Sequence, residues 1–172
     1  MLIDGHYLVG WSMLSSLISC YRDPFVEVAN HKLELTALYQ DCCRIYFSTK
    51  EYIRKHKLSK IYVFNGRLSY TKAILDAANA MSIYCAVHER GATFKKYSLF
   101  TNHTVHNISK ITECVIKSWN DQTDLVKRKE IGSLFYENRK NNIIGSWAGF
   151  LDLQDPTLLP LNWDSKKHNV VL

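Results

Sequence analysis

Two short apolar segments flank an alanine-rich segment in the middle of the chain, and this pattern restricts the fold more than any other feature. Residues 60–64 and 83–87 are rich in residues that favour strands, and Tyr70 to Met81 has apolar residues at helical spacing. Strand, helix and strand within about thirty residues form a βαβ unit. Such units have parallel strands and right-handed crossovers. The predicted fold class is therefore α/β, with a Rossmann-like, doubly wound parallel sheet and long flanking helices.

The remaining elements are predicted from the same patterns. A short helix is expected from Trp11 to Tyr21, and a long one from His31 to Lys57, where apolar residues recur at steps of three and four. Residues 96–101 fit either a strand or an extended loop. The apolar stripe that begins after Ser109 is imperfect, so one bent helix and two separate helices are both compatible with it.

Composition limits the class of protein. The chain has 172 residues, of which 47% are hydrophobic, which is enough for one domain with a core. Its five cysteines are an odd number without a CxxC pair, which favours a reducing compartment. No apolar run is long enough to span a bilayer, and the opening segment has no basic residue before its apolar stretch, unlike a signal peptide. A cytoplasmic location is predicted.

Polar, glycine-containing turns follow the predicted strands. Residues 65–67 follow the strand at 60–64, residues 89–91 follow the strand at 83–87, and Asp4-Gly5 ends a predicted strand at the start of the chain. Ligands of open α/β sheets bind outside the carboxyl ends of the strands. We therefore expect the three turns to open on one edge of the sheet. The candidate substrate-binding residues are Asn65, Gly66, Arg67, Arg90, Gly91 and His106, and the candidate catalytic residues are Asp4 and Glu89.

These side chains suit a ligand that carries hydroxyl and anionic groups. Arg67 and Arg90 can grip a phosphate or carboxylate with two hydrogen bonds each. Glu89 or Asp4 can act as a base toward a sugar hydroxyl. A structural alternative stays open, in which Glu89 pairs with Arg67 or Arg90 and braces the fold. The two hypotheses are compatible, because a brace also orients a site.

Several other kinds of site lack their motifs. No GxGxxG or GxxxxGK[ST] follows a strand, so neither a dinucleotide nor a P-loop phosphate site is predicted. No GxSxG elbow is present. His103 and His106 have no carboxylate or cysteine at a matching spacing, so neither a metal nor another cofactor is predicted. The basic clusters, such as residues 127–129, fit a solvated surface, and nucleic acid is not an expected partner.

The segment YVFNGRLSYTKAILDAANAMSIYCAVHERG resembles a block found in bacterial surface-polysaccharide glycosyltransferases, often described as capsule polysaccharide biosynthesis proteins. The shared features are a strand that ends in FNGR at 64–67, an alanine-rich helix, and a strand that ends in ERG at 89–91. Weaker similarities downstream include His106-Asn107 and the terminal KHNVV. The opening Asp4-Gly5 is similar to the first turn of that family.

The resemblance implies the amino-terminal, acceptor-side half of a two-domain GT-B glycosyltransferase. Residues 1–150 would form a Rossmann-like domain, residues 151–168 a linker, and residues 169–172 the first strand of a second domain that binds the nucleotide sugar. The chain is accordingly expected to be a fragment that lacks the donor-binding domain, with enzymatic activity only when completed by it. The implied partners are a nucleotide-sugar donor and a glycan or lipid-linked acceptor, with peripheral association at the inner membrane.

The function expected is transfer of a sugar in the synthesis of capsule or O-antigen polysaccharide. A base, Asp4 or Glu89, would deprotonate an acceptor hydroxyl, which then displaces the nucleotide from the anomeric carbon of the donor. Arg67 and Arg90 would stabilise anionic groups, and Asn65 and His106 would orient sugar hydroxyls. The alternative is a non-catalytic module of the same fold that binds a glycan or a partner chain.

Overall fold

The computed structural model describes residues 2–91, 96–141, 143, 163 and 166. Its elements in chain order are α1 (Val9–Tyr21), the 3-10 helix η1 (Val28–His31), α2 (Lys32–His56), β1 (Lys60–Phe64), α3 (Ser69–Ala80), β2 (Tyr84–Arg90), β3 (Tyr97–Thr101), α4 (Ile108–Asp121) and α5 (Leu125–Lys140). The predicted linker lies outside the described residues apart from Trp163 and Lys166, and the strand predicted at 169–172 lies outside them entirely.

The central βαβ unit is confirmed. β1 and β2 pair in parallel, with Lys60 opposite Tyr84 and Phe64 opposite His88, and α3 makes the crossover between them. The long helix α2 ends where Lys57 adopts the left-handed conformation and its N–H bonds back to Arg54. The open question about residues 96–101 resolves as strand β3. The imperfect stripe near the end resolves as two helices, α4 and α5.

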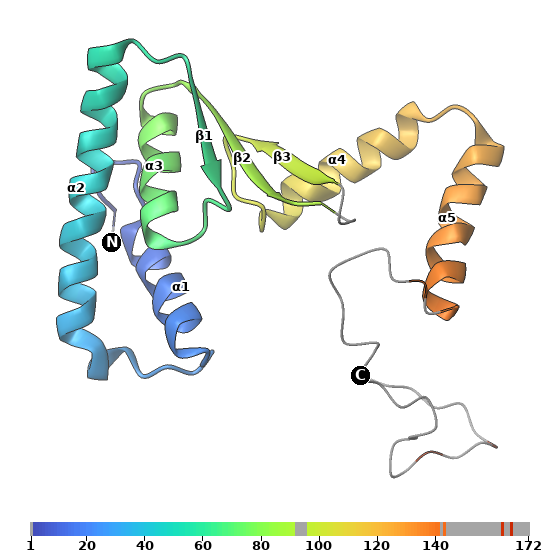
Figure 1. The fold of residues 1–172 in the computed structure, drawn as a ribbon, viewed down its shortest axis with the longest axis horizontal. Helices are drawn as coiled ribbons and strands as arrows, with labels where there is room; N and C mark the ends of the chain where they lie inside the picture. Colours follow the sequence, from blue (N-terminus) through green and yellow to red (C-terminus); the bar gives the residue numbers. More distant parts are fainter. Residues whose placement is uncertain (1, 92–95, 142, 144–162, 164–165, 167–172) are drawn as a thin grey trace.

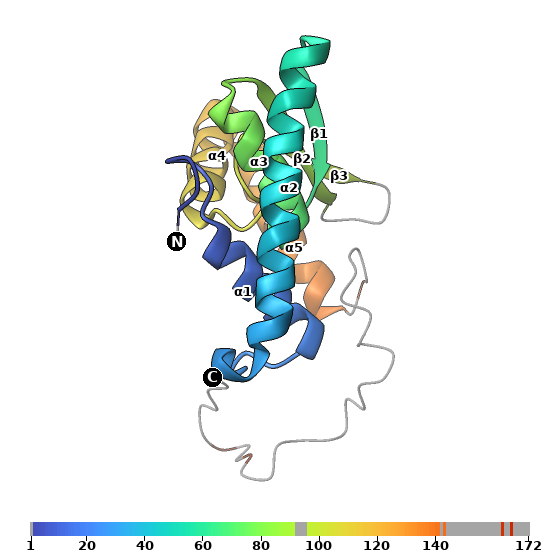
Figure 2. The same ribbon diagram turned by 90° about the vertical axis from the view of Figure 1, so that its left-hand side faces the viewer.

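Helix α3 is the middle layer of the molecule. It packs against β1 and β2 on one side and against α1 and α2 on the other, as Figures 1 and 2 show. Ala73 and Ala77 contribute to a core cluster with α2 and the segment before α1, while Leu75 and Ala78 contribute to a second cluster under the sheet. Both sides of α3 are therefore buried. Its alanines let neighbouring elements approach closely at no cost in helix propensity.

The predicted doubly wound parallel sheet is wrong. The sheet in the described part has three strands in the order β1-β2-β3, and β3 runs antiparallel to β2. The reason is the length of the connection: residues 91–96 separate the two strands, and a parallel return needs a crossover of about a dozen residues or more. A GT-B-like half with helices on both faces of a parallel sheet is therefore not supported.

The strand predicted at the start of the chain is not part of this sheet either. Ile3 and Tyr7 form an isolated antiparallel bridge with each other, around a turn in which Asp4 and Gly5 have φ of 54° and 72°. The segment pairs with itself, so it contributes no strand edge beside β1. Asp4-Gly5 consequently does not follow a strand of the sheet, as the sequence had suggested.

Candidate functional site

The turn after β1 is shaped by two residues in the left-handed conformation. Asn65 and Gly66 have φ of 61° and 69°, values that asparagine and glycine tolerate better than other residues. A Cβ atom on Gly66 would lie 3.1 Å from Leu75 and 3.2 Å from Val87 in the core, so a side chain there would also crowd its neighbours. The Asn65 N–H donates to the carbonyl of His88 at 2.9 Å, which extends the β1–β2 pairing by one residue.

Asn65 and Glu89 meet at the carboxyl ends of the two parallel strands. The Asn65 side-chain N–H donates from Nδ2 to Glu89 Oε2 at 2.6 Å. The Arg90 backbone N–H donates to the other carboxylate oxygen, Oε1, at 2.9 Å. Asn65 Oδ1 in turn accepts the backbone N–H of Arg67 at 3.2 Å. The carboxylate is thus held in place through both of its oxygens, and Asn65 links it to the turn.

Glu89 is ionised at neutral pH. Partial burial raises the pKa of its carboxyl group, but hydrogen bonds from Arg90 and Asn65 and the charges of His106 and Arg90 outweigh this, and the net effect lowers the pKa below its ordinary value. A carboxylate of lowered pKa is a good hydrogen-bond acceptor and a weak base. The environment therefore suits binding and orientation better than proton abstraction.

The Arg67 side chain reaches toward helix α1 instead of Glu89. Its Nη2 donates to Ser19 Oγ at 3.1 Å, and its Nε atom is buried with no hydrogen-bond partner. The sequence suggested that Arg67 or Arg90 would pair with Glu89. The side chain that bonds to the Glu89 carboxylate in place of Arg67 is Asn65. Arg67 instead ties the turn after β1 to α1.

Arg90 and Gly91 end strand β2. Arg90 is exposed and lies opposite Tyr97 of β3. At Gly91 the backbone of Lys96 comes so close that a Cβ atom would lie 2.7 Å from it, and the Gly91 N–H donates to the Lys96 carbonyl at 2.9 Å. The absence of a side chain at Gly91 therefore lets the β2–β3 connection close. The ERG motif did not predict this steric role.

His106 joins this group from a different segment. It is exposed in the loop between β3 and α4, and its charge contributes to the lowered pKa of Glu89. The structure thus brings together Asn65, Glu89, Arg90 and His106, which we call the strand-end cluster. Gly66, Arg67 and Gly91 shape the turns beside it.

Asp4 lies beside α2, away from the strand-end cluster. Its carboxylate forms an ion pair with Lys50 of α2 and accepts a hydrogen bond from the Tyr46 hydroxyl at 3.5 Å. The Lys50 contact lowers the pKa of Asp4. Because α3 lies between α2 and the sheet, the two predicted acids do not share one site (Figure 1).

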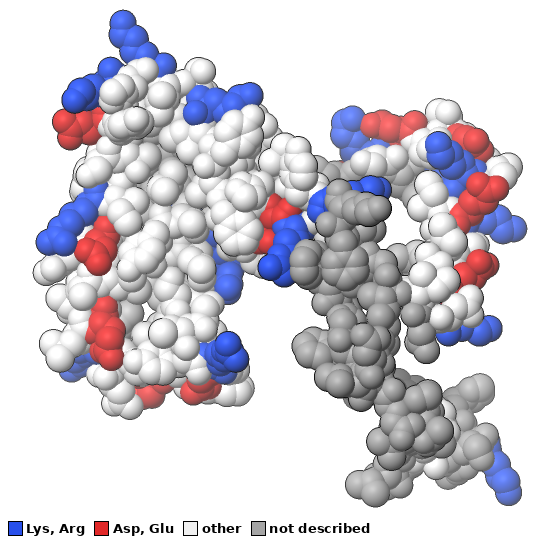
Figure 3. Space-filling view, viewed as in Figure 1, with Lys and Arg blue, Asp and Glu red and all other residues white. Residues whose placement is uncertain are grey.

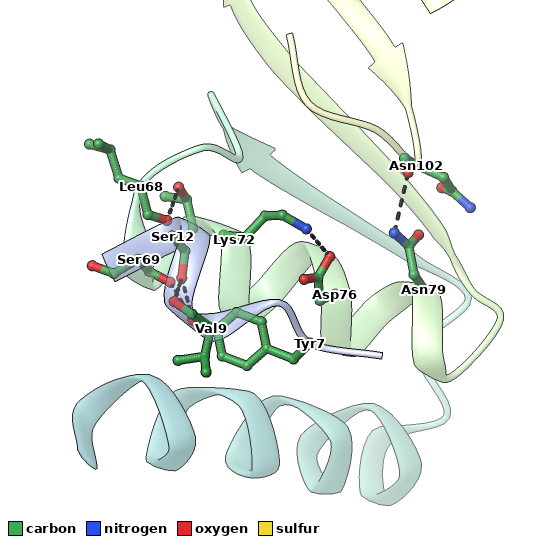
Figure 4. Close-up of polar contacts among 10 residues, drawn as sticks. Tyr7, Val9, Ser12, Leu68, Ser69, Lys72, Asp76, Asn79 and Asn102 are labelled. Carbon is green, nitrogen blue, oxygen red and sulfur yellow. Dashed lines mark hydrogen bonds and ion pairs between the residues drawn. The ribbon is translucent and has the colours of Figure 1, made fainter. Parts of the chain in front are cut away.

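The sequence analysis did not predict a buried polar network between the start of α1 and the start of α3. The Tyr7 hydroxyl bonds to Ser12 Oγ at 3.0 Å and donates to the Ser69 carbonyl at 3.1 Å (Figure 4). Asp76 is 5% exposed and pairs with Lys72 one turn earlier. An aspartate within the apolar run of α3 was a usable signal for a buried carboxylate. The hydroxyls of Tyr7 and Ser12 left no comparable pattern.

Few other features of the described residues limit the function. Within the described ranges, no three His, Cys, Asp or Glu side chains are grouped so that they could hold a metal ion. In the same part of the chain, no helix combines the length and apolarity that crossing a bilayer requires. Comparisons with family models, curated proteins and solved structures found no match. Function is therefore argued from the strand-end cluster itself.

Proposed function

We propose that this chain binds carbohydrate at the strand-end cluster, as a glycan-binding module in the synthesis of a bacterial surface polysaccharide. The observation that carries the proposal is the fixed pair of Asn65 and Glu89 at the ends of two adjacent parallel strands. Glu89 Oε2 accepts a hydrogen bond from Asn65 and Oε1 accepts one from the Arg90 backbone, and a carboxylate has about four acceptor positions with which it can also receive a sugar hydroxyl. Partial burial raises the pKa of Glu89, but hydrogen bonds from Arg90 and Asn65 and the charges of His106 and Arg90 lower it further than burial raises it, so this acceptor is ionised at neutral pH.

Sugar hydroxyls are good ligands for such a site because they donate to carboxylates and accept from amide, guanidinium and imidazole groups. A preformed carboxylate gives a charge-assisted hydrogen bond, about twice as strong as a neutral one. Little side-chain entropy is lost on binding, since Glu89 and Asn65 are already held. The arrangement thus supports recognition of hydroxyls without any catalytic step.

Glycosyl transfer is the second candidate function. The ionised Glu89 at the end of β2 favours it, because the sequence analysis names this residue as a candidate base toward the acceptor hydroxyl. The lowered pKa of Glu89 weakens it as a base, so binding ranks first. Assays for release of nucleotide from nucleotide sugars, with and without added glycans, test this candidate. Release that depends on the glycan and is lost in Glu89→Gln would place transfer ahead of binding.

The test of the binding proposal is a glycan microarray followed by calorimetry on the glycans that bind. We expect Glu89→Gln to weaken binding about 10- to 100-fold, since a hydrogen bond to a charged group contributes about 1.5–3 kcal/mol. Glu51→Gln, an exposed carboxylate of α2, is the matched control and should bind like the unchanged protein. The proposal fails if neutral and acidic glycans all fail to bind, or if Glu89→Gln binds as well as the Glu51→Gln control.

A further inference from the structure

Arg67 has no acidic partner in the described part of the chain, although much of its side chain is covered. The residue is half-buried, and its guanidinium donates from Nη2 to Ser19 Oγ at 3.1 Å. Its Nε atom is buried and has no hydrogen-bond partner. None of the ion pairs among the described residues involves Arg67. Because a covered arginine is usually paired with an anion, the surroundings of this guanidinium are incomplete.

The backbone beside Arg67 reinforces its preference for an anion. The residue lies just before α3, whose first turn contains no acidic residue and whose N-cap, Leu68, makes no side-chain hydrogen bond. Partial positive charge collects at the N-terminus of a helix and favours a negative group there. The first amide of α3, that of Ser69, is bonded to a neutral partner, Ser16 Oγ, at 2.8 Å. The start of α3 therefore adds positive potential and no counter-charge.

The ends of the two parallel strands carry more basic than acidic groups. Glu89 is the acidic member of the strand-end cluster, and the charges of His106 and Arg90 both act on it. Arg67 adds a further cation beside the cluster. Figure 3 shows acidic and basic side chains together at the rim of a largely uncharged surface over the strands. Glu89 is thus flanked by cations of its own, and the charge of Arg67 stays uncompensated.

Asn65 connects Glu89 with Arg67. Its Nδ2 atom donates to Glu89 Oε2 at 2.6 Å, and its Oδ1 atom accepts the Arg67 backbone N–H at 3.2 Å. The carboxylate and the start of the arginine side chain are therefore separated by one asparagine side chain. From there the guanidinium extends to Ser19 of α1, where it is held. A ligand of one or two sugar units has the size to reach both groups.

We propose that the carbohydrate bound at the strand-end cluster is acidic, and that Arg67 binds its carboxylate or phosphate group. This inference rests on the proposed function and adds the substrate class. Glu89 needs a hydroxyl donor and Arg67 needs an anion, and an acidic sugar carries both in one small unit. The terminal nitrogen atoms of a guanidinium can bind two oxygens of a carboxylate or phosphate together. A neutral sugar would leave Arg67 without a counter-charge.

The experiment compares acidic sugars with their neutral parents. The probes are glucose, glucuronate and glucose 6-phosphate, and galactose, galacturonate and galactose 6-phosphate. Inorganic phosphate and a twelve-residue oligothymidylate are the anions of other kinds. Affinities are measured by NMR titration at low and at high NaCl. The variants are Arg67→Gln, Arg67→Lys and Glu89→Gln, with Arg54→Gln, exposed in the last turn of α2, as the matched control. Melting curves verify that each variant folds.

We expect at least one acidic sugar to bind about ten-fold or more tightly than its neutral parent, since its hydrogen bonds to Arg67 are charge-assisted. Arg67→Gln should reduce the affinity for the acidic sugar to that of the parent and leave the parent unaffected. Arg67→Lys should retain part of the preference, because the charge remains. Arg54→Gln should change neither affinity. High NaCl should weaken the acidic sugar alone.

The outcomes that overturn the inference differ from those that overturn the proposed function. If no acidic sugar binds more tightly than its parent, or if Arg67→Gln leaves the preference intact, Arg67 does not bind an anion of the ligand. The proposed function is then retained only if Glu89→Gln weakens the neutral sugars. A preference that depends on Arg67, with neutral binding that Glu89→Gln leaves unchanged, retains the anion site and contradicts the cluster. Inorganic phosphate or oligothymidylate that binds as tightly as the acidic sugars excludes a sugar as the preferred ligand.

Discussion

At the scale of single residues, Asp76 shows how burial and pairing compete. Burial raises the pKa of this carboxyl group, and the nearby Lys72 ammonium offsets only part of the effect. The folded protein therefore holds the proton of Asp76 more tightly than the unfolded chain does. Ionisation of Asp76 costs stability, even though the residue has an oppositely charged partner.

A pH dependence follows with a definite sign. The contribution of Asp76 to stability should fall as pH rises from about 3.8, the ordinary value of an aspartate, through its raised pKa in the folded protein. Asp76→Asn should remove this part of the dependence, since an amide does not ionise. Urea unfolding at a series of pH values measures it, with Asp23→Asn, an exposed carboxylate, as the control. Parallel pH profiles for Asp76→Asn and the unchanged protein would contradict the prediction.

The residues of the candidate site were predictable in part. Asn65 and Glu89 could be placed at one edge of the sheet from the sequence, because the ends of adjacent parallel strands lie there. Their hydrogen bond was not predicted, since the expected partner of Glu89 was Arg67 or Arg90. Asp4 could not be placed, because whether a short apolar opening joins a sheet depends on tertiary pairing. The direction of Arg67 toward Ser19 is a long-range contact across 48 residues, which no local pattern encodes.

At the scale of elements, periodicity identified the helices well, and the layer arrangement explains why. Helix α2 has Cys42, Tyr46 and Ile53 buried along one stripe, so its spacing is easily recognised. The sheet was predicted less well. The antiparallel return of β3 follows from a short connection whose glycine approaches the Lys96 backbone. The side chains of β3 alternate between exposed and half-buried. Such a weakly apolar segment is compatible with both a strand and a loop.

The small residues of α3 are a testable requirement of its place between two layers. Ala77 is 0% exposed and packs in the cluster with α2. We expect Ala77→Leu to reduce the free energy of unfolding by about 1–3 kcal/mol, because a larger side chain must displace well-packed neighbours. Ala37→Leu, at an exposed position of α2, is the matched control and should change it by less than about 0.5 kcal/mol. Equal denaturation midpoints for the two variants would mean that α3 is not packed tightly against α2.

At the scale of the whole molecule, the described part has one well-packed region and an extension. The buried residues lie in the segment from Tyr7 to Val105, and both core clusters are built there. Helix α4 contains no buried residue, and α4 and α5 lead away from the helical layers in Figure 1. The strand-end cluster lies on the well-packed region. Strands β1 and β2, whose ends carry Asn65 and Glu89, share a core with α3, so the cluster is fixed before a ligand arrives.

This division predicts two classes of backbone amide in hydrogen exchange. Amides of α3 and β2 should open only with global unfolding, because both elements bury most of their inward side chains. Amides of α4 should exchange at least about 100-fold faster, since local opening of that helix exposes little additional apolar surface. Exchange measured by mass spectrometry on peptides from the two regions tests this. Equal protection of α4 and α3 would show that α4 is covered in solution and would contradict this division of the molecule.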